Sequence, residues 1–123
     1  MGYVQYGQVS VAEIRDGTSN TLLIGEQYTS TRPRRRSFWA YGWCAFNKSE
    51  VTPESRILLN DYDRCVEIGG SSHGCKRMWG SGHPGVMQFA FCDGSVRSLS
   101  MTIDVELLGH LATIAGGEVV TLP

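Results

Sequence analysis

The sequence has no long hydrophobic run and no segment that resembles a targeting signal. The longest uncharged stretch near its end, residues 107–117, is shorter than the roughly 20 apolar residues of a membrane-spanning helix and is interrupted by Gly109 and His110. Residues 1–8 show neither the basic segment nor the apolar run of a signal peptide. We therefore expect a soluble chain.

An excess of charge of either sign is also absent. Eleven Lys and Arg against 12 Asp and Glu give a formal net charge of −1, which provides no overall field to attract nucleic acid or an anionic membrane. Hydrophobic residues make up 41% of the chain and charged residues 19%, a composition unlike that of disordered proteins. With 123 residues the chain has the size of one domain, residues 1–123.

The sequence lacks any Cys-x-x-Cys pair, which weakens a zinc-ribbon or thioredoxin-like interpretation. It does contain an even number of cysteines, Cys44, Cys65, Cys75 and Cys92. Two disulfides are therefore plausible, but only in an oxidising compartment. Motifs of common enzymes are missing as well, because no serine lies in a Gly-x-Ser-x-Gly elbow and no phosphate-binding glycine loop precedes a helix.

Glycine is abundant, and turn signals divide the chain into short elements. Ser10 and Glu13 form a capping-box pattern that predicts a short helix, ended by Asp16-Gly17. Composition and alternation predict strands at residues 21–24, which we expect to be buried, and at 38–46. Asp104 is placed to cap a last helix with apolar residues at 107, 108, 111 and 114, and a strand is expected at 118–121.

The clearest local signal is a β-hairpin. Residues 86–92 and 95–99 have strand composition and flank Asp93-Gly94, a dipeptide typical of a two-residue primed turn. With that turn, Met87, Phe89, Phe91 and Val96 share the buried face. The elements together predict an α+β fold with an antiparallel β-sheet and short helices.

Two segments resemble a known family. The segment 14–26, which contains Asp16, Gly17, Ser19 and Asn20, resembles the central signature of the planctomycete-type pseudopilin-like family, long catalogued as of unknown function. The segment His83-Pro84-Gly85 and then Asp93-Gly94 resembles its C-terminal motif of a histidine, nine residues and Asp-Gly. Residues 103–104 and 111–119 also resemble the family's closing helix and strand.

The resemblance implies an extracytoplasmic pseudopilin-like head that assembles with other pilin-like subunits or secretion-system components. In that family a processed N-terminal membrane helix precedes the head, and this sequence lacks it, so contact with a membrane is expected only through that missing helix. A second departure is Ser98, where the family tends towards an aromatic or apolar residue. We expect Ser98 to weaken packing at one end of the buried hairpin face.

The oxidising compartment that the resemblance implies favours two disulfides over zinc. Of the three connectivities we favour Cys65–Cys75, which closes a short glycine-rich loop, with Cys44–Cys92 linking two strands. A zinc site of Cys65, His73, Cys75 and Cys92 has unfavourable spacing. Calcium occurs in loops of related pilin-like heads, but for Asp61, Asp63 and Glu67 we favour a solvated acidic loop. No metal and no cofactor is expected.

His83 and Asp93 invite a catalytic interpretation, which the predicted strand between them opposes. Ten residue steps at about 3.3 Å each hold their backbones far beyond hydrogen-bonding distance. We therefore expect structural roles, in which His83 bonds neighbouring backbone before Pro84 and Asp93-Gly94 forms the turn.

One candidate binding surface remains. Aromatic side chains can stack on sugars or bases and arginines can hold anions, so a surface could form from Arg34, Arg35, Arg36, Trp39, Tyr41 and Trp43. We favour a core position for these aromatic residues. The leading hypothesis is a non-enzymatic structural and interaction module of a type II secretion or type IV pilus-like filament. The alternative is a stand-alone module that binds a glycan or anionic polymer through this surface.

Overall fold

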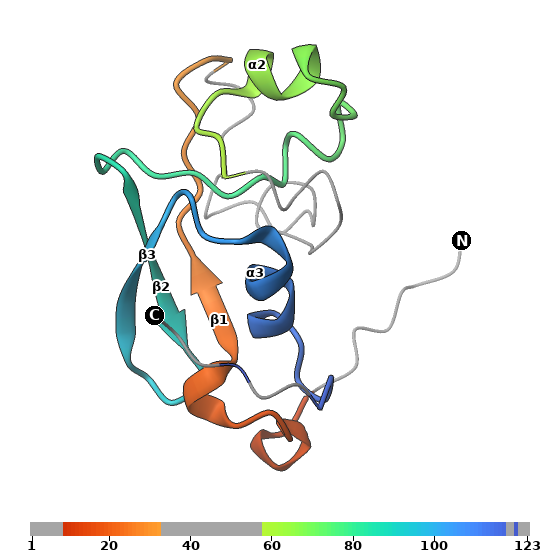
Figure 1. Cartoon of the computed structure of the whole chain (residues 1–123), viewed down its shortest axis with the longest axis vertical. Helices are drawn as coiled ribbons and strands as arrows, with labels where there is room; N and C mark the ends of the chain where they lie inside the picture. The colour runs from red at the N-terminus through yellow and green to blue at the C-terminus, as the bar shows by residue number, and fades with distance from the viewer. Residues whose placement is uncertain (1–8, 33–57, 118–119, 121–123) are drawn as a thin grey trace.

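The computed structural model describes residues 9–32, 58–117 and 120. In these ranges the elements follow in the order η1 (Val11–Glu13), η2 (Thr18–Asn20), β1 (Leu22–Gly25), α2 (Tyr62–Glu67), β2 (Val86–Phe91), β3 (Val96–Ser100) and α3 (Val105–Leu111). The strands form one antiparallel sheet in the order β1-β2-β3, beside which α3 lies (Figure 1). This arrangement confirms the predicted α+β fold with a small antiparallel sheet.

Two of the predicted strands cannot be compared with this fold. The strand expected at 38–46 lies outside the described residues, as does most of 118–121, of which only Val120 is described and has no strand geometry. None of the helices in the described ranges has the length and apolar character needed to cross a membrane.

The predicted hairpin is present, but its turn is one residue longer than expected. The Gly94 N–H donates to the Phe91 carbonyl at 3.0 Å, and the Phe91 N–H donates to the Ser95 carbonyl at 2.9 Å. Gly94 has a φ of +84°. This pattern is that of a three-residue loop, Cys92-Asp93-Gly94, in which the glycine forms a bulge. The prediction of a two-residue primed turn is therefore wrong.

The longer loop changes which residues of β3 face the core. Met87 pairs with Leu99, and Ala90 pairs with Val96. Because a shift of one residue moves a side chain to the opposite face of a strand, Leu99 is buried and Val96 is 64% exposed. The predictions that Val96 shares the buried face and that Ser98 weakens it are both wrong, since Ser98 is exposed on the outer face.

β1 contains an irregularity that exposes most of its apolar side chains. Leu22 pairs with Phe91 and Ile24 with the adjacent Ala90, so Leu23 is an extra residue in β1. Leu22 packs against the core, whereas Leu23 and Ile24 are 62% and 64% exposed. Of the buried strand expected at 21–24, Thr21 is buried but precedes β1, Leu22 is partly buried, and Leu23 and Ile24 are exposed, so the expectation of burial is wrong for the last two residues.

Side-chain caps begin the helices as the sequence predicts. Ser10 and Glu13 form a capping box at the start of η1, where the Ser10 N–H donates to Glu13 Oε2 at 2.6 Å. Asp104 Oδ1 accepts the Leu107 N–H at 3.0 Å at the start of α3. Leu108 and Leu111 of α3 join the sheet residues of the main core, whose buried members are Leu58, Met87, Phe89, Phe91, Leu99, Leu108 and Leu111.

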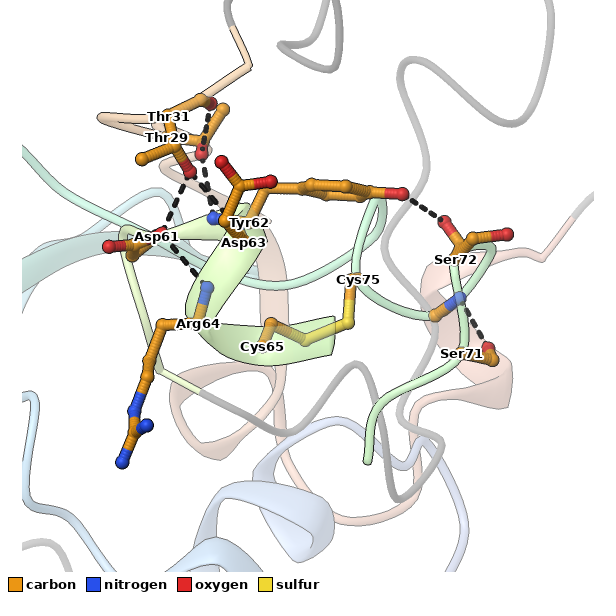
Figure 2. Close-up of a disulfide and its surroundings, with 11 residues drawn as sticks. Thr29, Thr31, Asp61, Tyr62, Asp63, Arg64, Cys65, Ser71, Ser72 and Cys75 are labelled. Carbon is orange, nitrogen blue, oxygen red and sulfur yellow. Dashed lines mark hydrogen bonds between the residues drawn. A yellow bond between two sulfur atoms is a disulfide. The ribbon is translucent and has the colours of Figure 1, made fainter. Parts of the chain in front are cut away.

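A second, smaller core lies around α2. It consists of Tyr62, Cys65, Cys75 and Met78, with Leu59 packed against it. The Cys65–Cys75 disulfide lies inside this core, with both residues almost fully buried, and Figure 2 shows it joining α2 to the following loop. The α2 lobe, residues 59–78, is thus organised around a disulfide rather than around a large apolar cluster.

Candidate functional site

The two family-like segments lie next to each other in the sheet. The first segment contains β1 itself, and the second contains β2 and the hairpin loop. Because β1 pairs with β2, the two segments lie side by side over their whole paired length. The motif residues therefore fall into two groups, one at each end of β1.

Asp16 is the central polar residue before β1. Its Oδ1 accepts the Gly117 N–H at 2.9 Å, and its Oδ2 accepts the Gly116 N–H at 2.8 Å and the Thr113 hydroxyl at 3.1 Å. The hydrogen bonds from Gly117 and then Gly116 hold the pKa of Asp16 below its ordinary value of 3.8. The carboxylate thereby fastens the loop after α3 to the segment before β1.

The next residues of this segment bind the hairpin loop. The Thr18 carbonyl accepts the Asp93 N–H at 3.0 Å, and the Thr21 carbonyl accepts the Cys92 N–H at 2.9 Å. The Asn20 side-chain amide lies 3.4 Å from the Asp16 carbonyl. Gly17, with a φ of +91°, supplies the left-handed backbone at the start of η2, while Ser19 is exposed.

Asp93 uses its side chain within the hairpin loop. Its Oδ1 accepts the Ser95 hydroxyl at 2.6 Å and the Ser95 N–H at 2.8 Å. The two Ser95 hydrogen bonds lower the pKa of Asp93. Arg97 lies 3.7 Å from Asp93 Oδ2 and places its guanidinium 4.5 Å from the centre of the Phe91 ring. Asp93 thus stabilises the turn, as the sequence analysis expected.

At the other end of β1, Glu26 contacts the start of the second segment. Its Oε2 accepts the Gln88 N–H at 2.8 Å, and its Oε1 lies 3.3 Å from His83 Nε2. Burial raises the pKa of Glu26, but hydrogen bonds from Gln88, Ser81 and His83 outweigh burial and leave the pKa lowered. The Ser81 hydroxyl also accepts the His83 N–H at 3.0 Å.

From the sequence, His83 was expected to bond only to neighbouring backbone. In the structure its imidazole also contacts the carboxylate of Glu26. Its imidazole is 53% exposed, and Asp93 lies at the opposite end of β2, bonded to Ser95. Pro84 and Gly85 form the exposed turn before β2, where Gly85 has a φ of +69° and its carbonyl accepts the Met101 N–H. The structure does not bring His83 and Asp93 together.

Gly25 lies against two aromatic rings, a contact that was not predicted from the sequence. A Cβ atom at this position would overlap the rings of Trp79 and Phe89, which pack against each other with centroids 5.1 Å apart. Glu26 and Thr113 were likewise not predicted as contact residues from the sequence. Glu26 belongs to the family-like segment 14–26, which was the available signal for it, whereas nothing near Thr113 in the sequence points to Asp16.

The cysteines only partly follow the predicted pairing. Cys65 and Cys75 form the predicted disulfide, with Cα atoms 5.8 Å apart. Cys92 is a free thiol, so the predicted Cys44–Cys92 bridge is not formed at Cys92, and Cys44 lies outside the described residues. The hairpin loop instead directs the Cys92 sulfur towards the Leu22 carbonyl, at 4.0 Å. Burial, with the charge of Asp93, raises the pKa of this thiol.

The residues considered for metal binding are separated or already paired. Within residues 9–32, 58–117 and 120, no three His, Cys, Asp or Glu side chains gather in a way that could hold a metal ion. Asp61 caps α2 by accepting the Arg64 N–H at 3.0 Å, as Figure 2 shows. Asp63 pairs with Arg32 at 2.9 Å, and Glu67 pairs with Arg64 at 2.7 Å. His73 lies in the loop of the disulfide, which removes Cys65 and Cys75 as thiolate ligands.

The aromatic and arginine surface predicted from Arg34, Arg35, Arg36, Trp39, Tyr41 and Trp43 falls outside the described residues. Its role in binding a glycan or an anionic polymer stays a prediction. In the described part, the motif residues make hydrogen bonds that hold chain segments together.

Comparison with known protein families identifies the family of this chain. No curated protein and no solved structure matches the chain. A family model described as "Protein of unknown function (DUF1559)" matches residues 2–106, which covers both ends of β1, the α2 lobe and the hairpin. Because the match spans most of the chain, the protein belongs to the DUF1559 family.

Proposed function

We propose that this chain is a non-enzymatic structural and interaction module, the extracytoplasmic head of a pseudopilin-like protein in a filament of the type II secretion or type IV pilus kind. The observation that carries the proposal is that the motif carboxylates are engaged in hydrogen bonds that hold loops of the fold together. Asp16 and Asp93 both accept backbone N–H groups, and both have lowered pKa values. Carboxylates committed in this way fasten loops, which is a role in the fold of the head.

The disulfide supports the proposed location. Cys65–Cys75 is buried within the core of the α2 lobe, where it replaces apolar packing. Such structural disulfides persist in oxidising environments outside the cytoplasm. A head displayed at the cell envelope or cell surface meets this condition.

The proposal is tested on the gene and in the source cells. We expect the reading frame to encode a basic segment, a prepilin-type cleavage site and an apolar helix of about 20 residues upstream of Met1. Natural translation starting at Met1 would count against a filament subunit.

The cellular test uses the full-length protein at its native level. We expect mechanical shearing of intact cells to release it together with other pilin-like subunits, and a membrane-impermeant protease to digest it. An Asp16→Ala variant should reduce the released amount by weakening the head, whereas Gly82→Ala, at an exposed glycine with open space around it, should not. Recovery of the protein only from the cytoplasm, with Cys65 and Cys75 as thiols, would refute the proposal.

A further inference from the structure

Within the described residues, one edge of the sheet has backbone groups that face no neighbouring strand. In the described part of the chain β3 pairs only with β2. The bonds from Phe91 to Ser95 and from Met101 to Gly85 show that residues 95 and 101 direct their backbone groups towards β2. Because backbone groups alternate along a strand, Val96, Ser98 and Ser100 direct theirs away from β2. Such an open edge is a template for pairing with another strand.

A cavity lies beside this edge. It has a volume of about 410 Å³ and lies between β3 and the start of α3, where Leu99, Ile103 and Leu107 provide apolar surface. Ser98, Ser100 and Thr102 add hydroxyl groups. We call the β3 edge and this cavity together the edge groove. A strand added at the edge would project every second side chain into the cavity, since side chains alternate between the two faces.

The edge groove carries negative charge at one end. Asp104 lines the cavity and is exposed, and its Oδ1 caps α3. Among the described residues no ion pair joins a cation to Asp104, and Arg97 of β3 is instead paired with Asp93 and stacked on Phe91 at the hairpin end of the strand. Asp104 follows the C-terminal end of β3, which is where the N-terminal end of an antiparallel partner would lie. A basic N-terminal residue on the partner therefore complements Asp104.

We propose that the edge groove binds an extended peptide, which adds to the sheet as a fourth strand antiparallel to β3. Its apolar side chains enter the cavity and a basic residue at its N-terminal end lies near Asp104. A second copy of β3 fits less well, because its core-side residues are Arg97 and Leu99, and Leu99 is 93% buried in its own core. The proposal goes beyond the proposed function and does not rest on it.

The test uses the synthetic peptide Lys-Thr-Val-Thr-Leu-Thr with an amidated C-terminus and the whole oxidised chain. Alternation places its Lys, Val and Leu on the cavity side. Titration followed by amide chemical shifts should give a dissociation constant below about 1 mM, with the shifts centred on residues 96–104. The amides of Val96 and Ser98 should also gain protection from hydrogen exchange.

A backbone substitution separates strand addition from other binding. Ser98→Pro removes the outward N–H of Ser98 and leaves the bonds to β2 in place, so we expect affinity to fall at least tenfold. Ser98→Ala keeps that N–H and removes only the side-chain hydroxyl, so it should lower affinity much less than Ser98→Pro does. Equal affinities of these two variants, both with native-like spectra, would overturn the proposal.

A charge substitution gives a second test that does not depend on the folding of the proline variant. Asp104→Asn retains a side-chain oxygen for the cap but removes the charge, and should weaken the peptide about threefold to tenfold. A peptide with Glu in place of Lys should bind the wild type more weakly than the Lys peptide does. Its affinity for Asp104→Asn should be equal to or higher than its affinity for the wild type. Absence of shifts at 1 mM peptide, shifts outside residues 96–104, or self-association of the chain through β3 would each overturn the proposal.

Discussion

The Gly117 N–H donates a hydrogen bond of 2.9 Å to Oδ1 of Asp16, which lies 101 residues earlier in the chain. The same carboxylate accepts the Gly116 N–H and the Thr113 hydroxyl, so one side chain joins the segment before β1 to the loop after α3. Because the bonds from Gly117 and Gly116 lower the pKa of Asp16, its contribution to stability depends on pH.

Replacing Asp16 should destabilise the fold in a pH-dependent way. Asp16→Ala removes all three hydrogen bonds that the carboxylate accepts, and Asp16→Asn retains only one oxygen acceptor. At pH 7 we therefore expect the melting temperature to be highest for the wild type, lower for the Asn variant and lowest for the Ala variant. The folded pKa lies below the unfolded one, so the charged-state advantage is fully present above the ordinary value of 3.8 and is lost as pH falls through the folded pKa.

Thermal unfolding followed by circular dichroism from pH 7 to pH 2 measures this effect. The difference between the wild type and Asp16→Asn should be constant near neutral pH and shrink at the acidic end of the series. A difference that grew as the pH fell, or no difference at pH 7, would mean that the carboxylate does not hold the Gly116-Gly117 loop.

Gly94→Val should destabilise the hairpin by about 1 kcal/mol or more, because a β-branched residue is strained at positive φ. In the described part of the chain no atom lies within 4 Å of the position of a Cβ at Gly94, so the cost comes from the backbone conformation. Gly82 also has open space but no positive φ, which makes Gly82→Val the matched control. Chemical denaturation gives both free energies of unfolding, and equal values would contradict the bulged turn.

Gly25→Ala should destabilise the protein for a different reason. The added methyl group would overlap the Trp79 and Phe89 rings, both of which belong to or pack against the main core. Overpacking of this kind costs about 1–3 kcal/mol. A Gly82→Ala variant adds the same methyl group in open space and should leave stability nearly unchanged. Near-wild-type stability of Gly25→Ala would show that the rings do not pack against Gly25.

The disulfide should be the main support of the α2 lobe. Its 10-residue separation and its burial lead us to expect a loss of about 2–4 kcal/mol in a Cys65→Ser/Cys75→Ser variant. Hydrogen exchange should rise in residues 59–78 more than in β2 and β3, because the main core contains neither cysteine. Uniform exchange across both regions would show instead that the two cores unfold together.

The thiol count provides a separate measurement. With Cys65–Cys75 closed and Cys92 free, reduction should increase the intact mass by about 2 Da, the mass of two protons and two electrons. Alkylation without reduction should label Cys92 slowly at neutral pH, because burial raises the pKa of its thiol. An increase of about 4 Da would restore the second disulfide that the sequence analysis favoured.

The sequence by itself determined the features that depend on neighbouring residues. Asp93-Gly94 between two apolar alternations specifies a hairpin, Ser10 with Glu13 specifies a capping box, and Asp104 caps α3. The Cys65–Cys75 bridge also closes a short loop and was expected from proximity along the chain. Each of these depends on backbone conformations and hydrogen bonds within a few residues, which local patterns express.

The tertiary structure alone decided the loop length, the register and the long-range contacts. Both a two-residue and a three-residue loop are compatible with Asp-Gly. The observed register turns Leu99 towards the core and Val96 towards the outer face, which buries the larger of the two apolar side chains. The contacts of Asp16 with Gly117 and of Glu26 with His83 join residues 101 and 57 positions apart. No local pattern encodes them, because they form only when the packing of β1 against β2 brings distant loops together.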